Sequence, residues 1–156
     1  MHPETRKTPD IATDANKQLV RRFYDEVWQK GNVDVADDVF ADDYIRHDLR
    51  ATEAAPGPEG QKRIAGAFRA AFPDLAFDVE ILIAEGDYVA ARWPASGTHT
   101  GRWGDVEATG RSVSFSGVNI FRFERGRVAE IWNHRDDLGL QEQLHADVFA
   151  GAPPES

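Results

Sequence analysis

The sequence predicts an α+β fold in which helices cover one face of a curved, mostly antiparallel β-sheet. Between Leu19 and Ala71 apolar residues recur every third or fourth position, which is typical of amphipathic helices. From Leu75 onward they alternate with polar residues, which is typical of strands with one solvated face. Helices followed by a run of strands indicate an α+β domain. With 156 residues the chain is long enough for one such domain and too short for two ordinary ones.

The composition narrows the classes of partner. A formal net charge of −9 argues against nucleic acid and against an anionic membrane surface. The absence of cysteine excludes disulfides and thiolate metal sites. No apolar run approaches the roughly 20 residues of a membrane helix, and the polar first residues lack the apolar stretch of a secretory signal. We therefore expect a cytoplasmic protein with one domain over residues 13–149, a disordered segment over 1–12 and a flexible tail over 150–156.

Three helices are expected in the first half of the chain. Thr13 or Asp14 can cap the first, and Gly31 ends it because glycine tolerates the left-handed backbone of a helix C-terminus. The second is short, roughly residues 33–40. A loop rich in proline and glycine leads to the third, where Pro58 suits the first turn.

About four strands are expected in the second half. The first covers residues 75–83 and the second residues 88–93 or beyond. The last two form a hairpin over residues 112–136 whose turn is Glu124-Arg125-Gly126. At this size the sheet cannot close on itself, so we expect a cone with an open, partly apolar interior.

The hairpin holds the residues most suggestive of chemistry. Alternation on its first strand puts one apolar set on the same side as a single amide: Val113, Phe115, Asn119, Phe121 and Phe123. Alternation on its second strand groups Val128, Trp132, His134 and Asp136. If both sets line one concavity, His134 and Asp136 point into an aromatic-walled space.

Four stretches resemble the SnoaL-like polyketide cyclases of the nuclear-transport-factor-2-like superfamily: LVRRFYDEVWQKGNVDVADDVFADDYIRHD, GTHTGRWGDVEATGRSV, NIFRFERGRVAEIW and DDLGLQEQL. Together they cover about residues 16–144 in the family's order. The resemblance implies a cone-shaped α+β barrel, of the nuclear-transport-factor-2-like or cystatin-like kind, with a deep pocket. It also implies a homodimer that acts on an apolar small molecule and needs no metal or organic cofactor.

The resemblance assigns a catalytic role to one carboxyl group. In the characterised cyclases, an Asp four residues beyond a Trp is the general acid/base of an intramolecular aldol closure, and Trp132 and Asp136 have that spacing. One carboxyl group serves as base and then as acid if its pKa lies near the working pH, and burial beside Trp132 would raise that pKa. Alternatively, Asp136 only caps the helix that follows.

Other side chains are expected to assist. His134 either binds substrate or tunes Asp136, or it is a half-buried structural residue at the end of a strand. His47 either polarises a carbonyl or is a surface residue. Asn119 is a polar group on an apolar face, so it binds either substrate or a neighbouring side chain. The remaining substrate-binding candidates would contribute walls or contacts unless they belong to the core: Tyr24, Trp93, His99, Phe121 and Trp132.

Two alternatives remain open. One resembles the ketosteroid isomerases of the same superfamily, with Asp48 as the base and Tyr24 as one donor to the oxyanion. The other is a non-catalytic binding or dimerisation module that keeps the cone. A metal site is not predicted, because the histidines lack helical His-x-x-x-His spacing. The motifs of serine hydrolases, nucleotidases and dinucleotide-dependent dehydrogenases are also missing.

Overall fold

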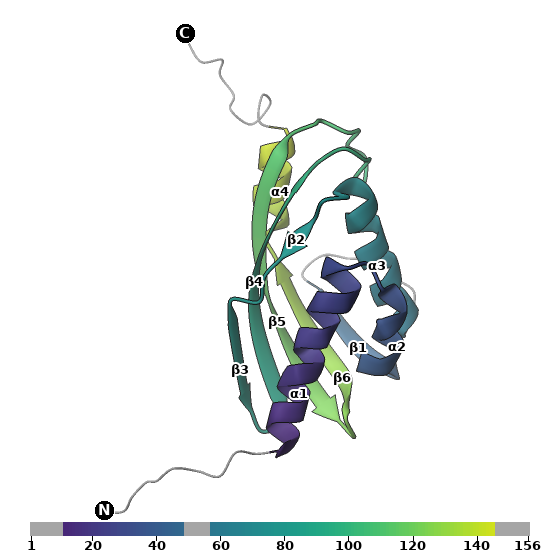
Figure 1. Cartoon of the computed structure of the whole chain (residues 1–156), viewed down its shortest axis with the longest axis vertical. Coiled ribbons are helices and arrows are strands. Elements are labelled where there is room, and N and C mark those ends of the chain that lie inside the picture. The colour runs from purple at the N-terminus through teal and green to yellow at the C-terminus, as the bar shows by residue number, and fades with distance from the viewer. Residues whose placement is uncertain (1–10, 49–56, 146–156) are drawn as a thin grey trace, which may run out of the picture.

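The computed structural model describes residues 11–48 and 57–145, and it confirms the predicted α+β class. The helices of the first half of the chain lie against one face of a curved sheet that does not close (Figure 1). The predicted disordered segment and tail lie outside the described residues, except for Ile11 and Ala12, which begin the first helix. No helix in the described part of the chain is long and apolar enough to cross a membrane.

The helical layer is formed mainly by two long segments. Its elements are α1 (Ile11–Arg22), the π-helical η1 (Phe23–Gln29), the 3-10 turn η2 (Val33–Val35), α2 (Ala36–Val39) and α3 (Pro58–Ala71). As predicted, Pro58 lies in the first turn of α3, and Gly31 follows η1 with a φ of 80°. The buried face of α1 and η1 is apolar and aromatic, which explains why this pair lies across the sheet.

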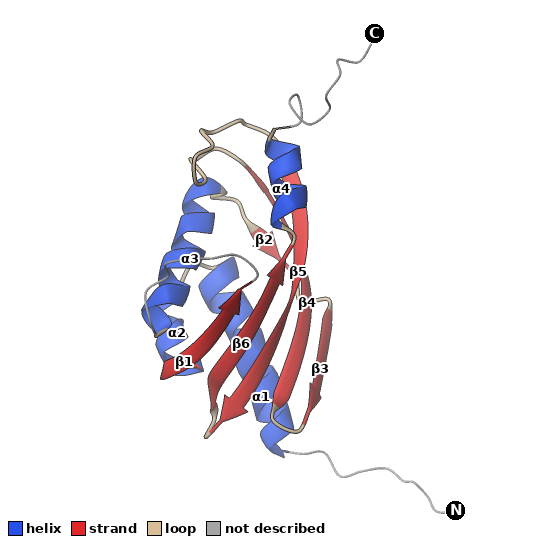
Figure 2. Cartoon of the chain, turned by 180° about the vertical axis from the view of Figure 1, so that it is seen from behind, coloured by secondary structure: helices blue, strands red, loops and turns tan. Residues whose placement is uncertain are grey.

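The sheet has the strand order β1-β6-β5-β4-β2, and β3 also pairs with β4. Its strands are β1 (Phe40–Asp48), β2 (Ala76–Phe77), β3 (Ile81–Glu85), β4 (Tyr88–Thr98), β5 (Ser112–Glu124) and β6 (Arg127–Arg135). The predicted strand over residues 75–83 is two strands. Residues 40–48, between the second and third predicted helices, form the nine-residue strand β1, which runs parallel to β6 (Figure 2). The other strand pairs are antiparallel.

A β-bulge in β6 changes which side chains face the helices. Arg122 pairs with Glu130 and Phe123 with Val128, so Ala129 is an extra residue without a partner on β5. A shift of one residue sends every later side chain to the opposite face. The predicted grouping of Val128 with Trp132 and His134 is therefore wrong, because Val128 is buried whereas His134 is exposed.

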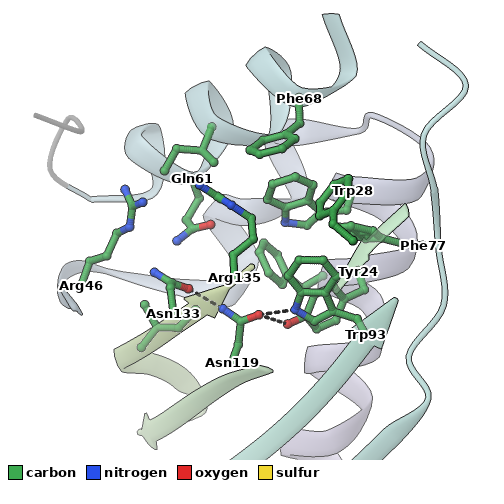
Figure 3. A pocket seen from close by; sticks show the side chains of 14 residues that line it. Tyr24, Trp28, Arg46, Gln61, Phe68, Phe77, Trp93, Asn119, Asn133 and Arg135 are labelled. Atoms are coloured by element: carbon green, nitrogen blue, oxygen red, sulfur yellow. Dashed lines mark hydrogen bonds between the residues drawn. The ribbon is translucent and has the colours of Figure 1, made fainter. Parts of the chain in front are cut away.

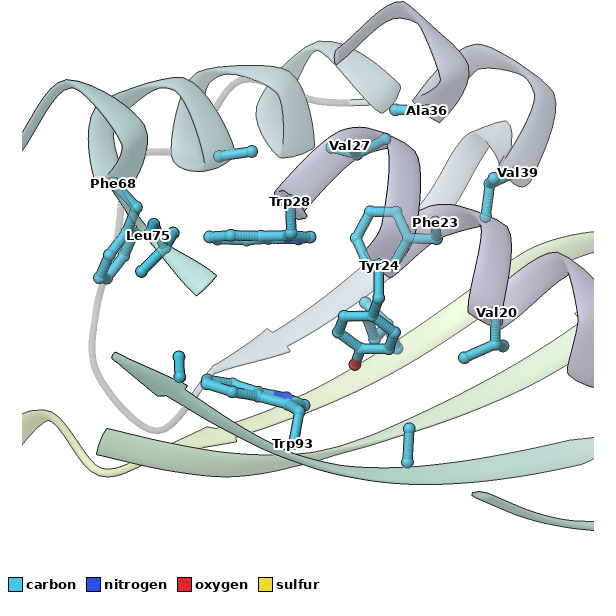
Figure 4. Packing of buried hydrophobic residues seen from close by; sticks show 14 of the residues in the cluster. Val20, Phe23, Tyr24, Val27, Trp28, Ala36, Val39, Phe68, Leu75 and Trp93 are labelled. Atoms are coloured by element: carbon cyan, nitrogen blue, oxygen red, sulfur yellow. The ribbon is translucent and has the colours of Figure 1, made fainter. Parts of the chain in front are cut away.

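The core lies between the helices and the concave face of the sheet. Its centre is aromatic, with Phe23 edge-on to Phe40 at 5.1 Å between ring centroids. Three further rings form a continuous stack, because Trp28 lies 5.0 Å from Phe77, and Phe77 lies 4.7 Å from Trp93. Figure 4 shows Trp28 reaching down from the helices toward Trp93 on the sheet. The stack links the two layers and forms one wall of the pocket described next.

Candidate functional site

A pocket opens between the helices and the concave face of the sheet. Together with its open mouth it encloses about 470 Å³ of space between the side chains. Aromatic side chains line one part of it, and polar side chains line another (Figure 3). The aromatic lining residues are Phe23, Tyr24, Trp28, Phe68, Phe77, Trp93 and Phe115. The polar ones are Arg46, Gln61, Asn119, Asn133 and Arg135.

Asn119 of β5 connects the aromatic part to the polar part. Its side-chain oxygen accepts a hydrogen bond from the Tyr24 hydroxyl at 2.8 Å and another from the Trp93 indole nitrogen. Its amide nitrogen donates to the side-chain oxygen of Asn133 on β6. The predicted substrate-binding residues Tyr24, Trp93 and Asn119 are thus brought together around one amide.

The hydrogen-bonded series continues to a buried carboxylate. The Asn133 amide nitrogen donates to Asp48 Oδ1 at 3.0 Å, and Arg46 Nη2 lies 2.8 Å from Asp48 Oδ2. The side chains of Arg46 and Asp48 are only 12% and 9% exposed, so this ion pair is largely shielded from water. Arg46 and Asn133 line the pocket, whereas Asp48 is not among its lining residues.

Arg135, at the end of β6, is the second cation of the lining. Its guanidinium interacts with the Asp137 carboxylate through two nitrogens and lies 4.6 Å above the centre of the Phe68 ring. Like Arg46 and Asp48, this pair is separated by one residue in the sequence. Both lining arginines are therefore held by a carboxylate that does not itself line the pocket.

Burial raises the pKa of the Tyr24 hydroxyl well above its ordinary value. Tyr24 is therefore a neutral hydrogen-bond donor to Asn119 at neutral pH. In this state it orients the amide and acts as neither a base nor a charged group.

The sheet places His47 and Trp132 on the face opposite the pocket. Their rings stack with centroids 5.0 Å apart, and His47 Nε2 lies 2.7 Å from Glu130 Oε2. Arg122 Nε donates to the other oxygen of Glu130 at 2.9 Å. The hydrogen bond with His47, and then the one from Arg122, lowers the pKa of Glu130. This cluster is an ionic and aromatic patch on the outer face, not a part of the pocket lining.

His134 and Asp136 are exposed, so the expectation that they point into the aromatic space is wrong. The cause is the bulge at Ala129, which turns the following alternation outward. Asp136 caps α4 (Asp137–Leu144), because its Oδ1 accepts from the Gly139 backbone N–H at 2.8 Å. Asp136 also lines a second, shallow groove together with Phe77 and Phe115, and the rings of these two residues line the central pocket as well.

The other two candidates are buried elsewhere. Phe121 is fully buried in the core, 6.1 Å from the Tyr24 ring. His99 is fully buried against Phe72, outside the pocket lining, and its Nδ1 accepts from the Thr109 backbone N–H. Burial, followed by the charge of His145, lowers the pKa of His99.

Sequence reasoning missed four polar lining residues: Arg46, Gln61, Asn133 and Arg135. Gln61 had a usable signal, because it lies on the same helical stripe as Ala65 and Phe68. Arg46 could be predicted to line the pocket only if its segment was known to be a strand. Asn133 and Arg135 could be predicted to line it only if the bulge in β6 was known, and the alternation of residue types does not reveal that bulge.

The chain is similar to a known protein family and to several solved structures. The family model described as SnoaL-like polyketide cyclase matches residues 18–144. TsrD from Streptomyces laurentii is 28% identical, with a TM-score of 0.77 over 89% of this chain and 99% of that one. A proposed polyketide cyclase from Acidithiobacillus ferrooxidans is 30% identical, with a TM-score of 0.75 over 88% and 99%. IdmH, a proposed polyketide cyclase from Streptomyces antibioticus, is 27% identical, with a TM-score of 0.70 over 83% and 97%. No curated protein matches the chain.

Proposed function

This chain belongs to the SnoaL-like polyketide cyclase family, and on that premise we propose that it closes a ring in an aromatic carbonyl compound by acid/base catalysis. The substrate lies in the central pocket with its apolar part against the Trp28, Phe77 and Trp93 rings. The observation that carries the proposal is the hydrogen-bonded series from Asn119 through Asn133 to Asp48. It joins an apolar site to a shielded carboxylate, a combination suited to proton transfer.

The proposed reaction is an intramolecular aldol closure. A base removes the proton next to a carbonyl, the resulting enolate carbon attacks a second carbonyl carbon, and the new alkoxide takes the proton back. One carbon–carbon bond forms and no electrons are exchanged with another molecule. The reaction therefore balances with side chains alone, and the proposal invokes no cofactor.

Asp48 is the proposed base and, once protonated, the acid. Its Oδ1 lies 3.0 Å from Asn133, which lines the pocket, so a single water can carry the proton between substrate and carboxylate. Each amide nitrogen of Asn119 and Asn133 uses one hydrogen within the series and keeps a second. These two N–H groups are the proposed donors to the enolate oxygen.

Asp136 is the second candidate for the base. Its spacing from Trp132 matches the family's pattern, and the groove that it lines shares Phe77 and Phe115 with the central pocket. A rearrangement of these two rings would connect the groove to the pocket. His134 and His47 remain candidate assistants only in that arrangement, because both side chains lie on the exposed face.

The test is proton exchange on 2-tetralone, an aromatic ketone whose α-protons are replaced by deuterium in heavy water and followed by NMR. We expect the protein to accelerate exchange over buffer, and Asp48→Asn to lower the acceleration by at least about 100-fold. Asp136→Asn is the matched comparison, since asparagine removes the charge and still caps a helix. Loss of exchange in Asp136→Asn with retention in Asp48→Asn would transfer the role to Asp136. If the unaltered protein gives no acceleration, the catalytic proposal fails.

A further inference from the structure

We infer that the substrate of this pocket carries a carboxylate, and that Arg46 is the residue that recognises it. The inference rests on the proposed function, because it specifies the class of molecule that the same pocket takes. It concerns three polar side chains of the lining that the proposed proton transfer leaves unused: Arg46, Gln61 and Arg135.

The buried guanidinium of Arg46 has donors without acceptors. Nη2 contacts Asp48, but neither Nε nor Nη1 has a hydrogen-bond partner among the described residues, although both atoms are buried. An unpaired buried N–H costs roughly 1–3 kcal/mol, and more when the group is charged. Such a cost is offset when a ligand supplies an acceptor. A carboxylate is suited to this role, because charge-assisted hydrogen bonds from arginine to carboxylate are short and strong.

The charge of the lining has the same sign throughout. Among the described residues that line the pocket, Arg46 and Arg135 are charged and no residue is acidic. Their carboxylate partners, Asp48 and Asp137, are not among the lining residues. Two inward cations are notable in a chain whose formal net charge is −9. The field at the polar part of the pocket therefore favours an anion.

The rest of the pocket specifies what the carboxylate is attached to. Figure 3 shows Arg46, Gln61 and Arg135 on one side and the rings of Trp28, Phe77 and Trp93 on the other. A ligand that spans both parts has an aromatic body and an acidic end. The substrate class is thus an aromatic carbonyl compound with a free carboxylic acid rather than its ester.

The experiment compares two probes of the same shape, 2-naphthoate and 2-naphthamide, by isothermal titration calorimetry. They differ in charge, so the ratio of their dissociation constants isolates carboxylate recognition. We expect 2-naphthoate to bind at least about 10-fold more tightly, the lower end for hydrogen bonds to a charged group. The ratio should fall to near unity in Arg46→Met and be partly kept in Arg46→Lys. Raising the salt concentration should also lower it.

Arg92→Met is the matched control, because Arg92 also pairs with a carboxylate, Glu80, but lies on β4 outside the pocket lining. The ratio should be unchanged in this variant. Equal binding of the two probes by the unaltered protein overturns the inference. It leaves the proposed function in place, because the exchange of 2-tetralone protons tests that function separately. An unchanged ratio in Arg46→Met also overturns it. If neither probe binds, the pocket is not an aromatic site, and both the inference and the proposed function fail. If Arg46→Met does not fold, the ratio of dissociation constants in Arg46→Lys and its dependence on salt concentration test the inference instead.

Discussion

Asn119 and Asn133 face each other on adjacent strands, and the amide nitrogen of Asn119 donates to the side-chain oxygen of Asn133. This contact fixes the orientation of both amides. Because the Asn119 nitrogen is directed to β6, its oxygen is left to accept from Tyr24 and Trp93. The pair therefore holds the helical layer, the sheet and the polar part of the pocket in one hydrogen-bonded series.

Replacing Asn119 by leucine should lower the free energy of unfolding by about 1–3 kcal/mol, because two buried donors lose their acceptor. Tyr24 and Trp93 are both buried, so water cannot readily replace the amide. Urea denaturation measures the effect. In the double variant Asn119→Leu with Tyr24→Phe, one of the orphaned donors is gone. The free energy of unfolding of the double variant should then fall by less than the sum of the decreases in the two single variants. Strict additivity would mean that the hydrogen bond contributes nothing.

The sequence allowed Asn119 to be predicted but not Asn133, and the reason is physical. On β5 the alternation is regular, so the buried face followed directly from the pattern of apolar residues. On β6 the extra residue Ala129 reverses the alternation after Val128, and no local residue type marks the bulge. Because of this reversal, regular alternation predicts His134 and Asp136 in the pocket, where the structure has Asn133 instead.

The helix order and the fold class were predictable because each depends on local periodicity. The parallel pairing of β1 with β6 was not, because it joins segments far apart in the chain. That pairing places Asp48 opposite Asn133 in the register. Arg46 and Asp48 therefore reach the candidate site through a long-range contact that no local pattern predicts.

Substitution of Asp136 separates its structural role from a catalytic one. Asp136→Ala should lower the free energy of unfolding by about 0.5–2 kcal/mol, because the Gly139 N–H loses its acceptor. Asp136→Asn should change it little, since asparagine is an equally good cap. Thermal denaturation of the two variants side by side makes the comparison. Equal destabilisation by alanine and asparagine would show that the negative charge, and not the cap, is what α4 requires.

His99 should make stability depend on pH. Its Nδ1 accepts from the Thr109 N–H at 3.1 Å, so the neutral ring carries its proton on Nε2. Protonation would put a second hydrogen against that donor, and burial already lowers the pKa. The folded state therefore binds fewer protons than the unfolded state. The contribution to stability is complete above the unfolded pKa of about 6.5 and is lost as the pH falls from there toward the lower folded pKa.

The measurement is the melting temperature of the protein and of His99→Asn between about pH 8 and about pH 5. Asparagine keeps an acceptor near the position of Nδ1 but does not titrate. We expect the melting temperature of the unaltered protein to fall more steeply with decreasing pH than that of the variant. Carboxylates contribute equally to both curves, so their difference isolates His99. Parallel curves would contradict the prediction.

Two glycine substitutions should act in opposite directions. A Cβ on Gly117 would lie 2.5 Å from the Trp93 ring and 2.7 Å from the backbone oxygen of His134, so Gly117→Ala forces the indole to move. We expect Gly117→Ala to lower the free energy of unfolding by about 1–3 kcal/mol, as at other overpacked sites. It should also weaken the binding of 2-naphthamide, because the Trp93 indole moves away from Asn119.

A Cβ on Gly66 meets nothing within 4 Å, and this residue is exposed in the middle of α3. Gly66→Ala should therefore raise the free energy of unfolding by about 0.5–1 kcal/mol and leave binding unchanged. Urea denaturation and calorimetry on both variants test the pair. Retention of full 2-naphthamide affinity in Gly117→Ala would mean that the position of the Trp93 ring does not define the pocket.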